Sequence, residues 1–117
     1  MTCLEGFLIP VPKAALDSYL RDAEAMAALW KEYGALTFVQ AVADNPPWGD
    51  KTSFPRAVDL KPDEVVVLAW MTFPDRATRD RAVERSSTDP RGAALTQGWT
   101  IDRSRMFFAS FQVAVSA

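Results

Sequence analysis

The residues from Glu64 to Phe73, EVVVLAWMTF, form a strand-length run that is apolar on both of its faces. Successive side chains of a strand point to opposite faces, so a strand covered on one side alternates apolar with polar residues. We assign to one face Val65, Val67, Ala69 and Met71, and to the other Val66, Leu68, Trp70 and Phe73. Both sides of the sheet must then be covered. The rest of the chain has helices enough for one side only, which predicts a partner subunit on the other.

The composition is that of an ordinary globular domain. A chain of 117 residues, 49% apolar and 24% charged, predicts a single domain over residues 1–117. The net charge of −2 gives no general attraction to phosphate backbones or anionic lipid, so we expect neither nucleic acid nor a membrane as a partner. No apolar run approaches the roughly 20 residues that span a bilayer, and the N-terminus lacks a signal-peptide pattern. A cytoplasmic location follows as the expectation.

The chain contains no histidine, which narrows the possible chemistry. Without imidazole there is no Ser-His or Cys-His nucleophile pair, no histidine-ligated haem and no conventional zinc site. Acid–base chemistry would have to use carboxylates, a lysine, Tyr19, Tyr33 or the substrate itself. The single cysteine, Cys3, allows no intramolecular disulfide and is interpreted as a small buried hydrophobe. The acidic residues match no calcium loop, so we expect no metal and no cofactor.

The periodicity predicts four strands and two long helices. In the first helix, apolar residues recur at spacings of three and four, and Gly34 follows as the residue past the helix end. The expected elements are a strand at Leu4–Ile9, closed by Pro10 and Pro12, a helix at Lys13–Tyr33, a strand at Ala35–Ala43, a strand at Glu64–Phe73, a helix from Pro74 to about Ser87, a short helix from Asp89-Pro90 to Gly98, and a strand at Met106–Val115.

This order, β-α-β-β-α-β, is the ferredoxin-like plan of an α+β protein. Its four-stranded antiparallel sheet has both long helices on one face. Packing against the sheet of a second subunit would bury the other face, which predicts a homodimer.

The segment from Asp44 to Asp63 is long for a connection and contains four prolines, so we expect it to be functional or packed against a neighbour. Phe54 and Val58 suggest that part of it is extended and docked. Trp48 lies on this segment and is interpreted either as a lid over a pocket or as an anchor on the other subunit; the enrichment of tryptophan at interfaces favours the anchor.

Several short motifs occur in a recognisable order along nearly the whole chain. They are PVPK (Pro10 to Lys13), Tyr19, WKEYGAL (Trp30 to Leu36), Asp44, SFPRAV (Ser53 to Val58), DEVVVLAW (Asp63 to Trp70), RD (Arg79-Asp80), DPR (Asp89 to Arg91) and RM (Arg105-Met106). Together they resemble the bacterial domain-of-unknown-function family fourteen twenty-eight. The resemblance implies a dimeric α/β barrel, and because the family is uncharacterised it implies no activity. Members often have Gly-Gly-Phe in the last strand, where this chain has Ala109-Ser110-Phe111.

The wider dimeric-barrel superfamily includes cofactor-free monooxygenases, haem-degrading enzymes and isomerases, so two functions remain open. The first is small-molecule binding or cofactor-independent catalysis, in a pocket between helices and sheet. The second is a non-catalytic structural or interaction module, and the sequence does not decide between an enzyme and a non-enzyme.

Candidate ligand-binding residues are the aromatic and charged side chains that such a pocket could use. Tyr19 and Glu64 are candidate polar groups; the alternatives are a tyrosine hydroxyl reaching water and a glutamate at a strand edge. Arg79 is a candidate anion anchor. The alternatives for the charged set are a surface pair of Arg76 with Asp80, an N-cap at Asp89, or a structural network at the subunit boundary. The full candidate set is Tyr19, Trp30, Trp70, Arg79, Asp80, Arg91 and Met106.

Overall fold

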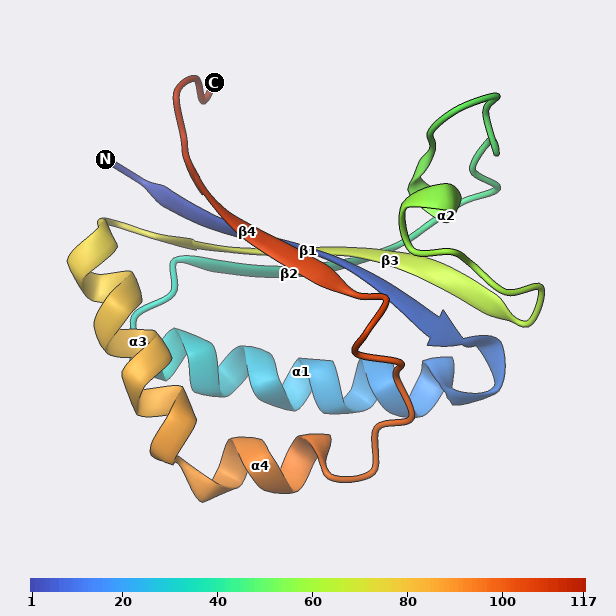
Figure 1. The fold of residues 1–117 in the computed structure, drawn as a ribbon. Helices are drawn as coiled ribbons and strands as arrows, with labels where there is room; N and C mark the ends of the chain where they lie inside the picture. Colours follow the sequence, from blue (N-terminus) through green and yellow to red (C-terminus); the bar gives the residue numbers. More distant parts are fainter.

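The computed structural model describes residues 1–117 and contains one four-stranded sheet with helices beneath it (Figure 1). The elements in chain order are β1 (Cys3–Pro12), a 3-10 turn η1 (Lys13–Ala15), α1 (Leu16–Tyr33), β2 (Thr37–Val42), α2 (Phe54–Ala57), β3 (Glu64–Phe73), α3 (Arg76–Thr88), α4 (Pro90–Thr96) and β4 (Phe107–Gln112). No helix is both long and apolar enough to cross a membrane.

The strands lie in the order β2-β3-β1-β4, and every neighbouring pair is antiparallel. This is the ferredoxin-like arrangement, and the predicted fold class is confirmed. The central pair is β1 with β3, in which Gly6 lies opposite Trp70. The strand predicted from EVVVLAWMTF has the observed bounds of β3.

The first strand is longer than predicted, because Pro10 and Pro12 continue it instead of closing it. The ladder between β1 and β4 ends at Leu8, so one side of β1 beyond that point has no neighbouring strand. A proline lacks the N–H that would be needed there, and it is tolerated where a strand has a free edge. The long β1–β3 pair therefore extends to Glu64.

Helix α1 packs along the sheet on the same side as α3 and α4 (Figure 1). Tyr19, Ala23 and Tyr33 are its most buried residues, so the helix turns this face most directly towards the sheet. Gly34 ends the helix with a φ of 121°, a conformation that glycine adopts without steric cost. Cys3 is buried in the core beneath the sheet, as expected.

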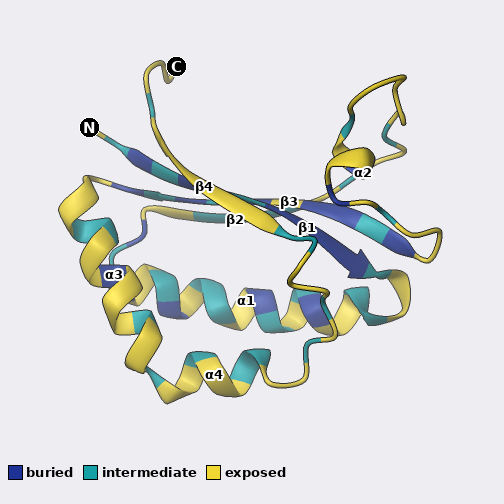
Figure 2. Cartoon of the chain, in the orientation of Figure 1, coloured by how far each residue is buried: buried dark blue, intermediate teal, exposed yellow.

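The alternation of β3 differs from the prediction at one residue. Phe73 lies on the helix side with Met71, in a core cluster that also contains Leu29 of α1. Thr72 takes the place on the opposite face that was assigned to Phe73, because the period of two requires it. That face still carries large apolar side chains, and three of them, Leu68, Phe107 and Phe111, are more than a third exposed. Figure 2 shows β4 as exposed along its length.

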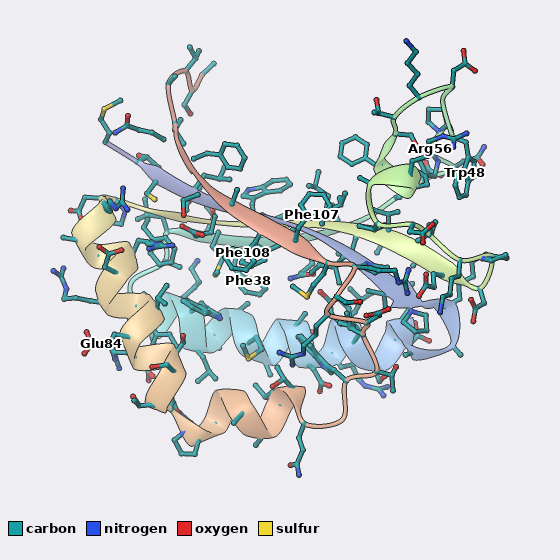
Figure 3. All side chains as sticks on the ribbon, in the orientation of Figure 1. Phe38, Trp48, Arg56, Glu84, Phe107 and Phe108 are labelled. Atoms are coloured by element: carbon teal, nitrogen blue, oxygen red, sulfur yellow. The ribbon has the colours of Figure 1, made fainter.

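We call the uncovered side the open face, defined by Leu4, Leu8, Leu68, Trp70, Phe107 and Phe111. Phe107 is 49% exposed and Phe111 57% exposed, values far above those of a core aromatic residue. Figure 3 shows Phe107 and Phe108 on opposite sides of β4, and Phe108 packs against Phe7 beneath the sheet. The helix side of the sheet is thus covered except at β4, where Phe108 is 64% exposed, and the open face is largely uncovered.

The segment at 44–63 crosses the open side and contains the short helix α2 (Figure 1). Ser53 starts α2 by accepting a hydrogen bond from the Arg56 N–H, and Pro55 follows at a position where its missing N–H is not needed. The expectation of an extended, docked segment was therefore wrong in part. Val58 is buried at 1% exposure, but Phe54 is 56% exposed.

Candidate functional site

A cavity of about 190 Å³ lies between α1 and the sheet. We call it the α1 cavity and define it by residues of α1, of β2 and of the segment that leads from α4 to β4. They are Tyr19, Trp30, Phe38, Gln40, Trp99 and Met106. The structure thus brings together four of the predicted residues that are far apart in the sequence: Tyr19, Trp30, Trp70 and Met106.

The polar centre of the α1 cavity is a pair of side chains. The Tyr19 hydroxyl donates a hydrogen bond of 2.6 Å to Gln40 Oε1, and the Tyr19 ring packs in a tilted arrangement against Trp99, with the ring centroids 4.9 Å apart. Tyr19 is 3% exposed, so the alternative of a hydroxyl that reaches water was wrong. Burial raises the pKa of Tyr19 to about 12, against a smaller lowering by Gln40, because a phenolate is poorly solvated in the interior. Tyr19 therefore remains a neutral phenol at physiological pH.

Trp99 and Gln40 are site residues that the sequence analysis missed. Trp99 follows α4 in an irregular segment with no periodic pattern, and its indole N–H donates to Asp22 of α1 at 3.0 Å. Gln40 can be recognised in the sequence, because it interrupts the apolar run from Phe38 to Val42 in β2. It shares the helix-facing side with Phe38.

Trp70 borders the α1 cavity in a different way from the other predicted residues. It stands between Ala69 and Met71, which are buried on the helix side, so its own side chain points to the open face. Its cross-strand neighbours there are Gly6 and Val39. Trp70 is thus among the lining residues of the predicted pocket, although its side chain points to the open face.

Arg79 does not line the α1 cavity; it lies in a network of its own. Its Nε donates to Glu5 at 2.7 Å, its Nη1 donates to Asp80 at 2.8 Å, and its Nη2 donates to Ser110. The two carboxylates raise the pKa of Arg79 further above its usual range. Asp80 pairs with Arg79, so the alternative of a surface pair between Arg76 and Asp80 was wrong.

Arg91 belongs to a second network, at the junction of α3 and α4. Asp89 caps α4 by accepting from the Arg91 N–H, as one alternative predicted. The same carboxylate accepts from the Tyr33 hydroxyl and from the Arg91 guanidinium, which also reaches Glu32. The Arg91 contacts hold the pKa of Asp89 well below its usual range. Both guanidinium groups are thus already neutralised by carboxylates of this chain.

Glu64 does not line the α1 cavity either. Arg105 binds it with two hydrogen bonds, and the Lys61 N–H donates to it at 2.8 Å. Its side chain is 6% exposed, so it is a buried ion-pair partner and not a polar group of the cavity.

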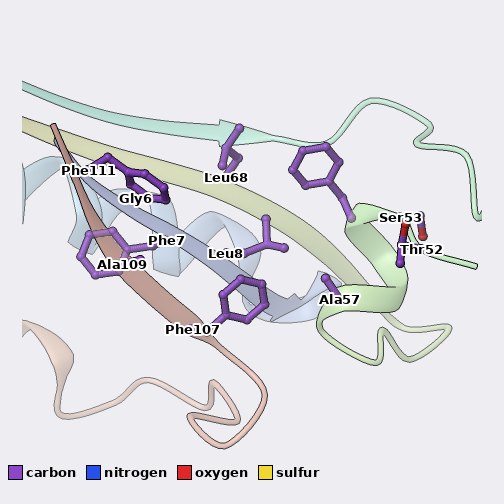
Figure 4. Close-up of a pocket in the computed structure, with 11 residues that line it drawn as sticks. Gly6, Phe7, Leu8, Thr52, Ser53, Ala57, Leu68, Phe107, Ala109 and Phe111 are labelled. Atoms are coloured by element: carbon purple, nitrogen blue, oxygen red, sulfur yellow. The ribbon is translucent and has the colours of Figure 1, made fainter. Parts of the chain in front are cut away.

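A second hollow, the open-face groove, runs between α2 and β4 on the other side of the sheet (Figure 4). It measures about 430 Å³ and is lined by Leu8, Ala57, Leu68, Phe107 and Phe111 among others. Its surface is almost wholly apolar and belongs to the open face of the sheet. No charged side chain lines it, so it has the character of a packing surface more than that of a reaction site.

Solved structures with this fold define its class. A dimeric ferredoxin-like protein from an uncultured marine organism matches all of the chain with a TM-score of 0.61 at 13% identity, covering 100% of both chains. A dimeric ferredoxin-like protein of unknown function from Jannaschia matches with a TM-score of 0.58 at 14% identity, over 95% of this chain and 99% of that one. SnoaB, a cofactor-independent oxygenase from Streptomyces nogalater, matches with a TM-score of 0.55 at 15% identity, over 98% and 93% of the two chains.

These similarities show a common fold. The sequence itself goes further: residues 2–103 match the model of a family described as protein of unknown function (DUF1428), and the chain belongs to this family. The uncharacterised protein YbaA of Escherichia coli K12 is 34% identical over 112 residues, which cover 96% of each chain. A YbaA from Shigella flexneri shows the same identity and coverage. The family resemblance derived from the motifs is thereby confirmed.

Proposed function

We propose that the protein is a homodimer and that each subunit binds one small, mostly apolar molecule in its α1 cavity. The observation that carries this proposal is the α1 cavity itself, which has apolar walls and one convergent polar pair, Tyr19 with Gln40. Binding pockets for small molecules combine these two features.

The volume limits the size of the bound molecule. An apolar cavity of about 150 Å³ accommodates a single benzene ring. The α1 cavity, at about 190 Å³, therefore suits one ring with a small substituent. A large polycyclic molecule would extend beyond it into solvent.

The homodimer is supported by the open face. Leu68, Phe107 and Phe111 are each more than a third exposed, and they form a continuous apolar surface. Exposed apolar patches of this kind mark interaction sites, and two sheets can pack face to face at about 10 Å. Two structural neighbours are described as dimeric. We place this homodimer in the cytoplasm.

Binding is favoured here over acid–base catalysis. SnoaB is a cofactor-independent oxygenase, and the chain shares its fold at only 15% identity. Tyr19 is the only titratable side chain at the α1 cavity, and its raised pKa keeps it from acting as a base near neutral pH. Arg79 and Arg91 are each paired with two carboxylates. This pairing favours a structural role for the charged motifs, which is the role they would have in a non-catalytic module.

Tryptophan NMR signals test the proposal with toluene as the probe. Toluene should shift the indole signals of Trp30 and Trp99, which line the α1 cavity. Trp48, on the other side of the sheet, is the internal control and should not move (Figure 3). Filling the cavity with Ala23→Leu should abolish the shifts. If toluene moves no cavity signal at saturation, the proposed function is wrong.

A further inference from the structure

We infer that the α1 cavity selects neutral aromatic molecules that carry a hydrogen-bond acceptor, such as an aryl carbonyl. The inference rests on the proposed function and adds to it the chemical class of the ligand. It follows from three properties of the cavity: the absence of a cationic side chain, a free hydrogen-bond donor, and aromatic walls.

The first property excludes charged ligands. No lysine or arginine lines the α1 cavity, and Gln40 is its one lining residue that is neither apolar nor aromatic. Moving a carboxylate or phosphate into such a site without a positive partner costs far more than the apolar contacts return. Since no aspartate or glutamate lines the cavity either, a cation also finds no counter-charge, and a ligand with a permanent charge is disfavoured.

The second property concerns the donors of Gln40. Its Oε1 accepts from Tyr19, and its Nε2 carries two N–H groups that donate to no acceptor of the chain. The opposite orientation of the amide leads to the same result, because Nε2 would then donate to the Tyr19 oxygen and free the Tyr19 hydroxyl as a donor. In either orientation the pair offers an unused N–H or O–H. A ligand oxygen that accepts it completes the pair.

The third property favours a ring. Phe38 and Trp30 stand on opposite walls, from β2 and α1, and Met26 and Met106 lie among the lining residues. Aromatic faces and thioethers make favourable contacts with another aromatic ring. With a volume of about 190 Å³, the ligand is one ring that bears a short carbonyl substituent.

Two probes of nearly equal shape separate hydrogen bonding from packing. Acetophenone carries a C=O group where α-methylstyrene carries a C=CH₂ group, so they differ mainly in the acceptor. Their dissociation constants are measured with the purified protein through the Trp30 and Trp99 signals. The measurement is repeated for two double variants, Tyr19→Phe with Gln40→Met and Tyr19→Phe with Gln40→Leu, which remove the donors of both side chains and keep the cavity apolar.

In both variants acetophenone should bind about 3- to 10-fold more weakly, the range for one neutral hydrogen bond, whereas α-methylstyrene should bind within twofold of its original affinity. Thermal melts identify any variant that fails to fold, and the other variant then gives the answer. If both probes bind the original protein but respond equally to the substitutions, the inference is overturned and the proposed function stands. If neither probe binds the original protein, both are wrong.

Discussion

Arg105 holds Glu64 with two parallel hydrogen bonds, from Nη1 to Oε1 at 2.8 Å and from Nη2 to Oε2 at 2.6 Å. Both side chains are largely buried, at 14% and 6% exposure. Arg105 Nη1 also donates to the carbonyl oxygens of Val58 and Asp59. The pair thus ties the approach to β4 to the residues between α2 and β3. The paired guanidinium lowers the pKa of Glu64, against the opposing effect of burial.

Glu64→Gln should destabilise the protein by about 2 kcal/mol, because it leaves the buried guanidinium without its bidentate carboxylate. The free energy of unfolding from urea denaturation checks this value. Glu84→Gln is the matched control, since Glu84 is exposed on α3 and its side chain forms no ion pair (Figure 3). Equal stabilities of the two variants would contradict a stabilising role for the Glu64–Arg105 pair.

The elements that the sequence predicted well are those that local pattern determines. The run at Glu64–Phe73 is a strand because it is apolar and β-branched, and Gly34 ends α1 because its backbone conformation suits glycine. The apolar character of the open face also follows from the alternation of residues along β3, even though Phe73 was assigned to the wrong side. Periodicity carries this information within a few residues.

The candidate site was predictable only in part, because it depends on which distant residues meet. Tyr19 and Trp30 could be predicted from the helical spacing of apolar residues. Trp99, which contacts Tyr19, lies in an irregular segment whose sequence shows no periodic pattern. Likewise, nothing local to Arg79 indicates that its guanidinium meets Glu5, 74 positions away in the sequence. Such partners are set by tertiary packing.

The pH dependence of stability should reflect Asp102. Ser104 and then Arg105 donate to its carboxylate and lower the pKa of Asp102 to about 2. A depressed carboxyl pKa stabilises the native state above the unfolded value near pH 4, and this contribution is lost as the pH falls towards 2. The Tm difference between the protein and Asp102→Asn should therefore be constant from about pH 7 to pH 5 and nearly vanish at about pH 2.

Asp50→Asn is the control for this titration, because Asp50 lies exposed on the 44–63 segment. Its Tm should follow that of the original protein throughout. A Tm difference for Asp102→Asn that persists undiminished at about pH 2 would show that the carboxylate charge is not the cause.

The open face should control the oligomeric state. Leu68→Glu places a charge at the centre of the proposed sheet-to-sheet interface and should weaken dimerisation about 100-fold or more. Val83→Glu is the matched control, because Val83 lies on α3, outside the open face, with a nearly equal exposure of 41% against 38% for Leu68. Light scattering should give twice the chain mass of 13.0 kDa for the original protein and for Val83→Glu, and the single mass for Leu68→Glu at micromolar concentration. A monomeric original protein would contradict the proposed dimer.

Trp48 is 51% exposed, its main-chain oxygen accepts from Arg56, and the Arg56 guanidinium lies 5.8 Å from its ring centroid. It lies on the opposite side of the sheet from α1, so it cannot be a lid over the α1 cavity (Figure 3).

If Trp48 is an anchor on the partner subunit, Trp48→Ala should weaken dimerisation about tenfold or more, the usual cost at an interface hot spot. Lys51→Ala, on the same segment, should change neither dimerisation nor toluene binding. Sedimentation velocity measures dimerisation, and titration with toluene measures binding in the α1 cavity. A Trp48→Ala variant that dimerises normally would remove Trp48 from the interface, and one that loses toluene binding would contradict the independence of the two sites.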